Sequence, residues 1–126
     1  MSIRTPLARV RGLGAAKDGT HHWWLQRLTA VALIPLTIWF VIVLTSHLGM
    51  GRAELARWMR SPSSAAPLAL FLVAGFWHLK LGLQVVIEDY VHHEGWKTGL
   101  IIAMNLAVVT LGVTGLASIL FLAMGG

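Results

Sequence analysis

Three long stretches of the chain contain no Lys, Arg, Asp or Glu, and they constrain the fold more than any other feature. They are 24, 19 and 29 residues long and lie between Arg27 and Arg52, between Arg60 and Lys80, and after Lys97. A helix needs roughly 20 predominantly apolar residues to cross the hydrocarbon core of a bilayer. We therefore predict an all-α membrane protein with three transmembrane helices, at about residues 24–48, 66–90 and 98–124.

The composition agrees with a membrane protein. Only 12% of the 126 residues are charged, against about 25% in an average soluble domain. No internal repeat divides the chain, so we treat residues 1–126 as a single membrane domain. Three helices offer few partners for polar groups within the bilayer, so we expect the chain to be a subunit of a larger assembly.

Residues 1–20 form a basic arm rich in glycine and alanine. Basic residues gather on the cytoplasmic side of membrane proteins, so we expect a cytoplasmic N-terminus in the inner membrane of a bacterium. An arginine-rich arm also fits a transit peptide, which keeps the mitochondrial inner membrane as the alternative. The predicted orientation places six basic residues inside (Arg4, Arg9, Arg11, Lys17, Arg27 and Lys97) and three outside (Arg52, Arg57 and Arg60).

Two classes of function are excluded or disfavoured by composition. The chain has no cysteine, so it has no disulfides and no thiolate ligands for an iron–sulfur cluster. Its net charge of +5 comes largely from the basic arm beside the membrane. We therefore expect membrane lipid and no nucleic acid as a partner.

Polar residues interrupt the second apolar stretch, in HLKLGLQVVIEDY at residues 78–90. At 100° per residue, Asp89 lies about 20° from His78 around a helix, and Gly82 and Val85 lie within about 40° of His78. Asp89 is about 16 Å further along the axis at 1.5 Å per residue. If Asp89 is at the cytoplasmic surface, His78 lies near the middle of the bilayer.

A histidine at that depth indicates a functional site. The residues alone leave three roles open for His78: ligation of a metal or haem, proton relay, and a hydrogen bond between helices. Gly82 favours haem, because a flat macrocycle needs a helix surface without a side chain beside the ligand. No second histidine is expected at that depth, so another subunit would supply a second axial ligand. The remaining histidines lie at or beyond the predicted helix ends: His21, His22, His47, His92 and His93.

Two further residues of this stretch keep alternative interpretations. Lys80 points 200° away from His78 on a helix, and it can extend towards water or pair with an acid or a haem propionate. Tyr90, the only tyrosine, fits the aromatic belt at the interface. Alternatively, its phenol donates a hydrogen bond to a ligand oxygen, with Asp89 beside it.

Proline and glycine positions predict several local features. Pro35 is expected to kink the first helix, and Pro67 is expected in the first turn of the second helix. An amphipathic turn is expected at residues 54–58. Gly112 and Gly115 share one side of the third helix, where another helix can approach closely, although glycine is common in membrane helices anyway.

The same polar residues carry a resemblance to a known family. His78, Gly82, Gln84, Asp89 and Tyr90 in HLKLGLQVVIEDY resemble the second helix of the hydrophobic membrane anchor subunit of succinate dehydrogenase, respiratory complex II. GTHHWWLQRLTA, residues 19–30, resembles the start of that family's first helix. The segment VIEDYVH, residues 86–92, resembles the corresponding segment of α-proteobacterial and mitochondrial members. The resemblance covers most of the chain, but only the first two segments are specific.

This resemblance implies roles for five residues. His78 would be one axial ligand of a b-type haem, whose other ligand lies on a cytochrome b556 subunit. Tyr90 would donate a hydrogen bond to a carbonyl oxygen of ubiquinone, and Asp89 would lie in or near the proton route. Arg27 matches an arginine near the haem propionates, and His21 matches a histidine near the quinone and the propionates.

One neighbouring position departs from the pattern of the family. Some relatives have an acid directly after the histidine that His21 matches, whereas this chain has His22. A proton role based on an acid at that position is therefore in doubt.

The resemblance also implies an expected function. The chain would be the membrane anchor subunit of succinate:ubiquinone oxidoreductase, in the tricarboxylic acid cycle and respiratory electron transport. Its partners would be the cytochrome b556, iron–sulfur and flavoprotein subunits. Succinate oxidation would belong to the flavoprotein, because this chain has no nucleotide-binding fingerprint. The alternatives are the anchor of a fumarate reductase, or a small proton-relay or transport subunit.

Overall fold

The computed structural model describes residue 6 and residues 15–126. Most of the predicted basic arm, including Arg4, Arg9 and Arg11, lies outside the described residues, as do the side chains of Lys17 and Asp18. The described part contains helices and no strand: α2 (Ala15–Ser46), α3 (Arg52–Met59), α4 (Pro62–Tyr90) and α5 (Glu94–Ala123). Among these helices, α2, α4 and α5 are long and apolar enough to span a membrane, which confirms the predicted fold class.

The predicted bounds of the three long helices need correction, mainly at their starts. α2 begins at Ala15 and not near residue 24, α4 at Pro62 and not near residue 66, and α5 at Glu94 and not near residue 98. The predicted bounds followed the apolar runs. The polar residues before each run also form helical main-chain hydrogen bonds, so each helix begins earlier than its apolar run. Pro62 starts α4, where a missing N–H costs no helical bond. Pro67, predicted for that role, lies inside the helix.

The first long helix continues through its proline. Pro35 lies inside α2, which extends without a break to Ser46 and not to the predicted residue 48. The turn that follows contains Gly49 with a φ of 91°, in the left-handed region that glycine adopts without steric cost. This turn leads the chain into α3.

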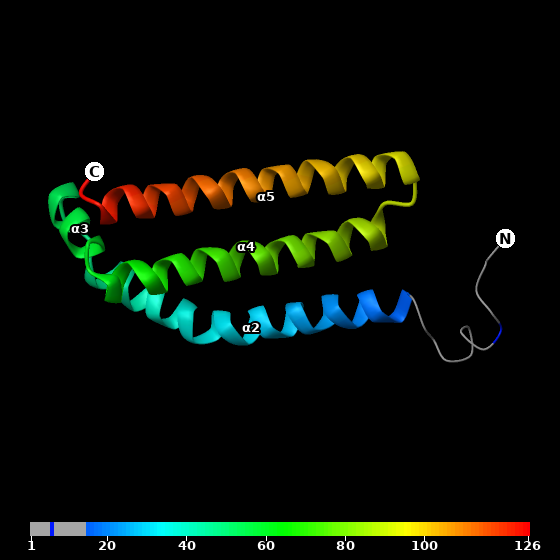
Figure 1. Ribbon diagram of the computed structural model, residues 1–126, viewed down its shortest axis with the longest axis horizontal. Helices are drawn as coiled ribbons and strands as arrows, with labels where there is room; N and C mark the ends of the chain where they lie inside the picture. Colours follow the sequence, from blue (N-terminus) through cyan, green and yellow to red (C-terminus); the bar gives the residue numbers. More distant parts are fainter. Residues whose placement is uncertain (1–5, 7–14) are drawn as a thin grey trace.

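The three long helices form a single layer (Figure 1). α4 lies in the middle and packs against α2 on one side and α5 on the other, while α2 and α5 do not contact each other. α4 and α5 are antiparallel neighbours, as the short connection between them predicted. The start of α2 and the α4–α5 connection lie at one end of the layer, and α3 and the C-terminus lie at the other.

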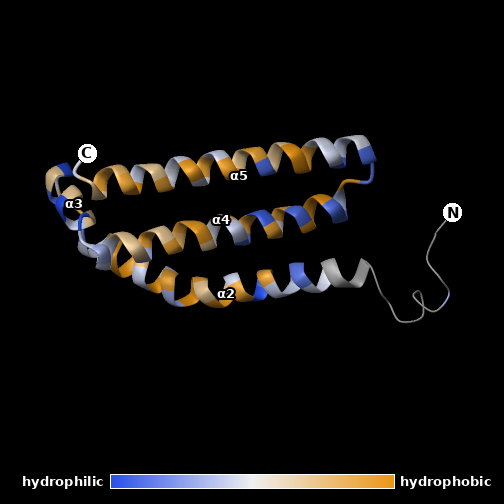
Figure 2. Ribbon diagram, viewed as in Figure 1, coloured by the Kyte–Doolittle hydropathy of each residue, from blue (hydrophilic) through white to orange (hydrophobic). Residues whose placement is uncertain are grey.

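A single layer leaves most apolar side chains uncovered. Among the described residues, only three large apolar side chains are buried, those of Met59, Leu81 and Ile119. Figure 2 colours most segments of the three long helices orange, the colour of hydrophobic residues. Lipid or other membrane subunits must cover these faces, because so large an apolar surface is not found on soluble monomers. The fold thus agrees with a subunit of a membrane assembly.

The short helix α3 covers one end of the layer. It has eight residues, against the single turn predicted at residues 54–58. The Gly51 N–H donates to Glu54 Oε2 over 3.3 Å at its start. Near its end, the Trp58 ring stacks on Trp39 of α2 with centroids 6.4 Å apart, and Met59 is buried. These contacts fix α3 against the long helices. The arginines of α3 are exposed.

Candidate functional site

One helix, α4, carries the three residues expected to be most important. His78, Asp89 and Tyr90 all lie on its half nearer the α4–α5 connection, where Figure 2 shows hydrophilic segments. Because the helix is continuous, the 11 residues from His78 to Asp89 correspond to about 16 Å along its axis. His78 is half-buried, whereas Asp89 is exposed and Tyr90, the last helical residue, is 79% exposed. The helix therefore has an inner and an outer polar position.

His78 makes a hydrogen bond to the neighbouring helix α2. Its Nδ1 lies 3.1 Å from Thr29 Oγ1, and both side chains are partly buried. The Nε2 atom has no hydrogen-bond partner among the described residues. The interhelical hydrogen bond and ligation were opposing interpretations of this histidine. They are compatible here, because they use different nitrogens of the ring.

Gly82 lies beside a side chain of the neighbouring helix α2. A Cβ built on Gly82 would have Gln26 Nε2 of α2 as its nearest neighbour, at 3.9 Å. At that distance an added Cβ would make an ordinary contact with the glutamine, so Gln26 does not require a glycine here. The interpretation of Gly82 as a position that favours haem stays a prediction.

Polar atoms also lie between α2 and α4 nearer the end of the layer that holds the α4–α5 connection. A cavity of about 330 Å³ is lined by Gly19, His22, Gln84, Val85 and Glu88. His22 Nε2 and Gln26 Oε1 are buried and have no hydrogen-bond partner among the described residues. Polar side chains of both helices therefore line this part of the contact between α2 and α4.

The two residues expected near haem propionates or quinone lie on the surface of α2. His21 is exposed, while its neighbour His22 is half-buried and turned towards the cavity. Arg27 is exposed, and its guanidinium carbon lies 5.4 Å from the centre of the Trp23 ring. Neither His21 nor Arg27 forms a hydrogen bond with His78 in the described chain. Both remain accessible to a group outside this chain.

Two further charged residues of α4 have partners on their own helix. The Lys80 ammonium lies 5.4 Å from the centre of the Trp77 ring, a cation–π contact that was not among the predicted partners. Gln84 Nε2 donates to Glu88 Oε1 over 2.9 Å, one turn apart. Both contacts keep their charges on the surface of the helix.

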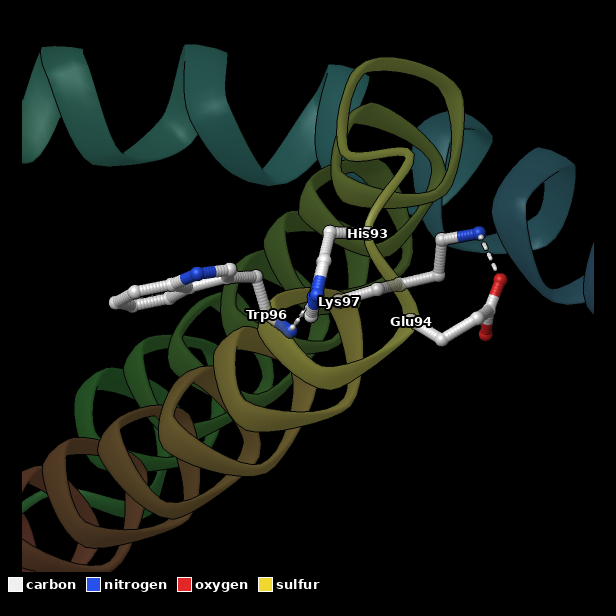
Figure 3. Close-up of polar contacts among 4 residues, drawn as sticks. All are labelled: His93, Glu94, Trp96 and Lys97. Carbon is white, nitrogen blue, oxygen red and sulfur yellow. Dashed lines mark hydrogen bonds and ion pairs between the residues drawn. The ribbon is translucent and has the colours of Figure 1, made fainter.

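The connection beside Tyr90 is held by short-range polar contacts (Figure 3). The Trp96 N–H donates to His93 Nδ1 over 3.4 Å, which places a side-chain cap at the start of α5. Lys97 Nζ and Glu94 Oε1 form an ion pair at 3.2 Å. These contacts fix the first turn of α5, which begins four residues after Tyr90.

A metal site formed by the chain alone is not present in the described residues. They contain no cluster of three or more His, Cys, Asp or Glu side chains that could hold an ion. A haem iron has a different requirement, because the porphyrin supplies four of its ligands and a protein supplies axial ones. A single histidine with a free Nε2 is therefore sufficient on one side of a haem.

Comparison with known proteins identifies the family. Residues 1–114 match the family described as succinate dehydrogenase/fumarate reductase transmembrane subunit. The chain belongs to this family. The resemblance noted in the sequence is thereby confirmed, and a membrane location agrees with the three long apolar helices.

Several similar proteins have names that agree with this family. The succinate dehydrogenase hydrophobic membrane anchor subunit of Paracoccus denitrificans is 34% identical over 119 residues, which cover 93% of this chain and 92% of that protein. The subunit of the same name from Rickettsia bellii is 32% identical over 104 residues, covering 82% and 83%. The succinate dehydrogenase membrane anchor subunit of Reclinomonas americana is 28% identical over 100 residues, covering 77% and 82%. No solved structure matches the chain significantly.

Sequence reasoning missed the α2 side of the site. Thr29 and Gln26 lie on the face of α2 that meets His78 and Gly82, and neither was singled out. A signal was present in LQRLTA, where Gln26 and Thr29 are three residues apart and so share a helical face. Both are polar residues at the start of an apolar run, which is a position worth examining in a membrane helix.

Proposed function

We propose that this chain is the membrane anchor subunit of a succinate:ubiquinone oxidoreductase, that His78 is an axial ligand of a b-type haem, and that Tyr90 and Asp89 form part of the ubiquinone site. The observation that carries the proposal is His78 itself. It lies within an apolar helix, its Nδ1 is held by α2, and its Nε2 has no partner in the described chain. Full-length similarity to anchor subunits supports the same assignment.

The described residues fit one side of a haem. His78 offers a nitrogen ligand, and the exposed Arg27 and His21 offer positive or hydrogen-bonding groups for propionates. Two further polar contacts between α2 and α4 are offered by His22 Nε2 and Gln26 Oε1, which have no hydrogen-bond partner among the described residues. A bound haem supplies a centre that takes up and releases one electron. Its second axial histidine would come from the cytochrome b556 subunit. His21 and His22 lie seven or more residues before Thr29 on α2, and His47, His92 and His93 lie outside the helices.

The quinone site is proposed at the end of α4. Tyr90 is exposed, so its hydroxyl is free to donate a hydrogen bond to a carbonyl oxygen of ubiquinone. Asp89 is exposed beside it, and a carboxylate at the water edge can pass protons to a quinone that takes up two electrons and two protons. Electrons would arrive from the iron–sulfur subunit, and succinate would be oxidised in the flavoprotein subunit.

The orientation and membrane follow from the same proposal. The N-terminus and the α4–α5 connection would face the bacterial cytoplasm, where the soluble subunits bind, and α3 would face outward. The mitochondrial inner membrane is the alternative location. An anchor of a fumarate reductase is the second candidate function, and the description of the matching family includes it. A small proton-relay or transport subunit is a third candidate.

A visible absorption spectrum of the complex purified with its native partners tests the proposal. The unmodified complex should be red and show b-haem bands, and His78→Ala should lose them. His47→Ala is the matched control, because His47 bonds through Nδ1 to the main-chain oxygen of Val43 at the opposite end of α2. Haem bands that survive in His78→Ala would contradict the haem assignment. The soluble subunits that co-purify separate the candidate functions. Subunits that oxidise succinate support the succinate dehydrogenase anchor, and subunits that chiefly reduce fumarate support the fumarate reductase anchor. The absence of soluble subunits favours a transport function.

A further inference from the structure

Thr29 of α2 is a hydroxyl residue whose hydrogen is already engaged. Its Oγ1 lies 2.8 Å from the main-chain oxygen of Leu25 and 3.1 Å from that of Gln26. Both carbonyl oxygens only accept hydrogen bonds, and a hydroxyl has one hydrogen and two lone pairs. With the hydrogen of Thr29 directed to these acceptors of its own helix, its lone pairs remain available to a donor.

The His78 ring supplies that donor. Its Nδ1 lies 3.1 Å from Thr29 Oγ1. Because the hydroxyl hydrogen points to the carbonyls of α2, Nδ1 carries the hydrogen and donates it to Thr29. A neutral imidazole has one protonated nitrogen and one with a free lone pair. The free lone pair is then on Nε2, the nitrogen that has no partner in the described chain.

We infer that Thr29 is a positioning residue for His78: its hydroxyl holds the imidazole in the tautomer and orientation that leave Nε2 free to bind iron. The inference rests on the proposed haem function and assigns a role to a residue of the other helix. The partners of ligating histidines act in this way in metal sites generally, where they fix the ring and raise the basicity of the ligand. Here the partner belongs to α2, so the contact between α2 and α4 is what prepares the ligand.

The inference predicts the direction of a change in haem potential. A hydrogen bond donated from Nδ1 makes Nε2 more electron-rich, and a more electron-rich ligand favours the more positively charged ferric iron. Loss of the Thr29 acceptor should therefore raise the midpoint potential of the haem. It should also weaken haem retention by roughly 10- to 100-fold, the usual effect of removing such a partner.

The test uses the complete complex with Thr29→Val, which keeps the shape of the side chain and removes the hydroxyl. Thr29→Ser keeps the hydroxyl and should restore the potential and haem content of the unmodified complex. Thr45→Val is the matched control, because Thr45 also bonds to main-chain carbonyls of α2 (2.8 and 2.9 Å) but is exposed and forms no hydrogen bond with a histidine of the described chain. The readouts are the midpoint potential from a redox titration of the haem bands and the haem content after repeated washing.

The outcomes separate the inference from the function on which it rests. A raised potential and a lower haem content in Thr29→Val, with Thr29→Ser and Thr45→Val unchanged, support it. Unchanged potential and haem content in Thr29→Val overturn it, while loss of haem in His78→Ala still upholds the proposed function. If His78→Ala keeps its haem, the proposed ligation of haem by His78 is wrong. Should Thr29→Val fail to assemble, Thr29→Ala provides the same measurements without a bulky branched side chain.

Discussion

Gly115 of α5 lies directly against Leu72 of α4. A Cβ built on Gly115 would lie 2.8 Å from Leu72 Cδ2, closer than a real Cβ comes to another atom. By contrast, a Cβ built on Gly112 would meet nothing within 4 Å. The prediction that glycines permit a close helix approach on this side of α5 is thus confirmed for Gly115, whereas Gly112 makes no such contact within the described chain.

This difference predicts unequal effects of the same substitution. Gly115→Leu should destabilise the packing of α4 on α5 by about 1–3 kcal/mol, the usual cost of overfilling a packed interface. Gly112→Leu adds the same side chain at an open position and should cost much less. The melting temperature and yield of the purified complex measure both. Equal losses in the two variants would contradict a special role for the Gly115 contact.

Tyr90→Phe should weaken quinone binding without affecting the fold. The side chain is 79% exposed, so loss of the hydroxyl breaks no packing. One neutral hydrogen bond contributes about 0.5–1.5 kcal/mol, which corresponds to a rise of roughly 2- to 10-fold in the KM for ubiquinone. The haem spectrum should not change. Trp96→Phe, at an exposed aromatic residue of the same end, should leave the KM unaltered, and an unaltered KM in Tyr90→Phe would argue against the quinone role.

Lys80→Met should leave the haem potential unchanged. Because the Lys80 ammonium lies 5.4 Å from the centre of the Trp77 ring on its own helix, we expect that it does not also neutralise a propionate. The substitution removes a cation–π contact that contributes about 0.5–1 kcal/mol, and Lys80→Arg should keep that contact. A redox titration of the haem bands in Lys80→Met provides the check. A marked shift in potential would restore the pairing of Lys80 with a propionate as the better interpretation.

The sequence was most informative about features that lie within one helix. The three apolar runs and the spacing of His78 and Asp89 depend only on residue type and helical period, so both could be predicted. Contacts between helices could not, since they depend on rotation and register. The Thr29–His78 hydrogen bond and the Gln26 side chain beside Gly82 both require α2 to be placed against α4. The helix starts were misplaced for another reason, because hydropathy marks the edge of the apolar run and not the end of main-chain hydrogen bonding.

The proposed orientation predicts which connection is accessible from outside the cell. The chain has no cysteine, so a single introduced thiol is the only one that maleimide can label on this chain, and the label is read on the separated chain. Ser63→Cys near the start of α4 and His92→Cys in the α4–α5 connection are both at exposed positions, at opposite ends of the layer. A membrane-impermeant maleimide applied to spheroplasts should label the thiol at position 63, and it should label the one at 92 only after the membrane is permeabilised. Labelling of position 92 in intact spheroplasts would reverse the orientation and move the proposed quinone site to the outer face. Denatured samples of both variants provide the total thiol signal, so poor reactivity cannot be mistaken for a cytoplasmic location.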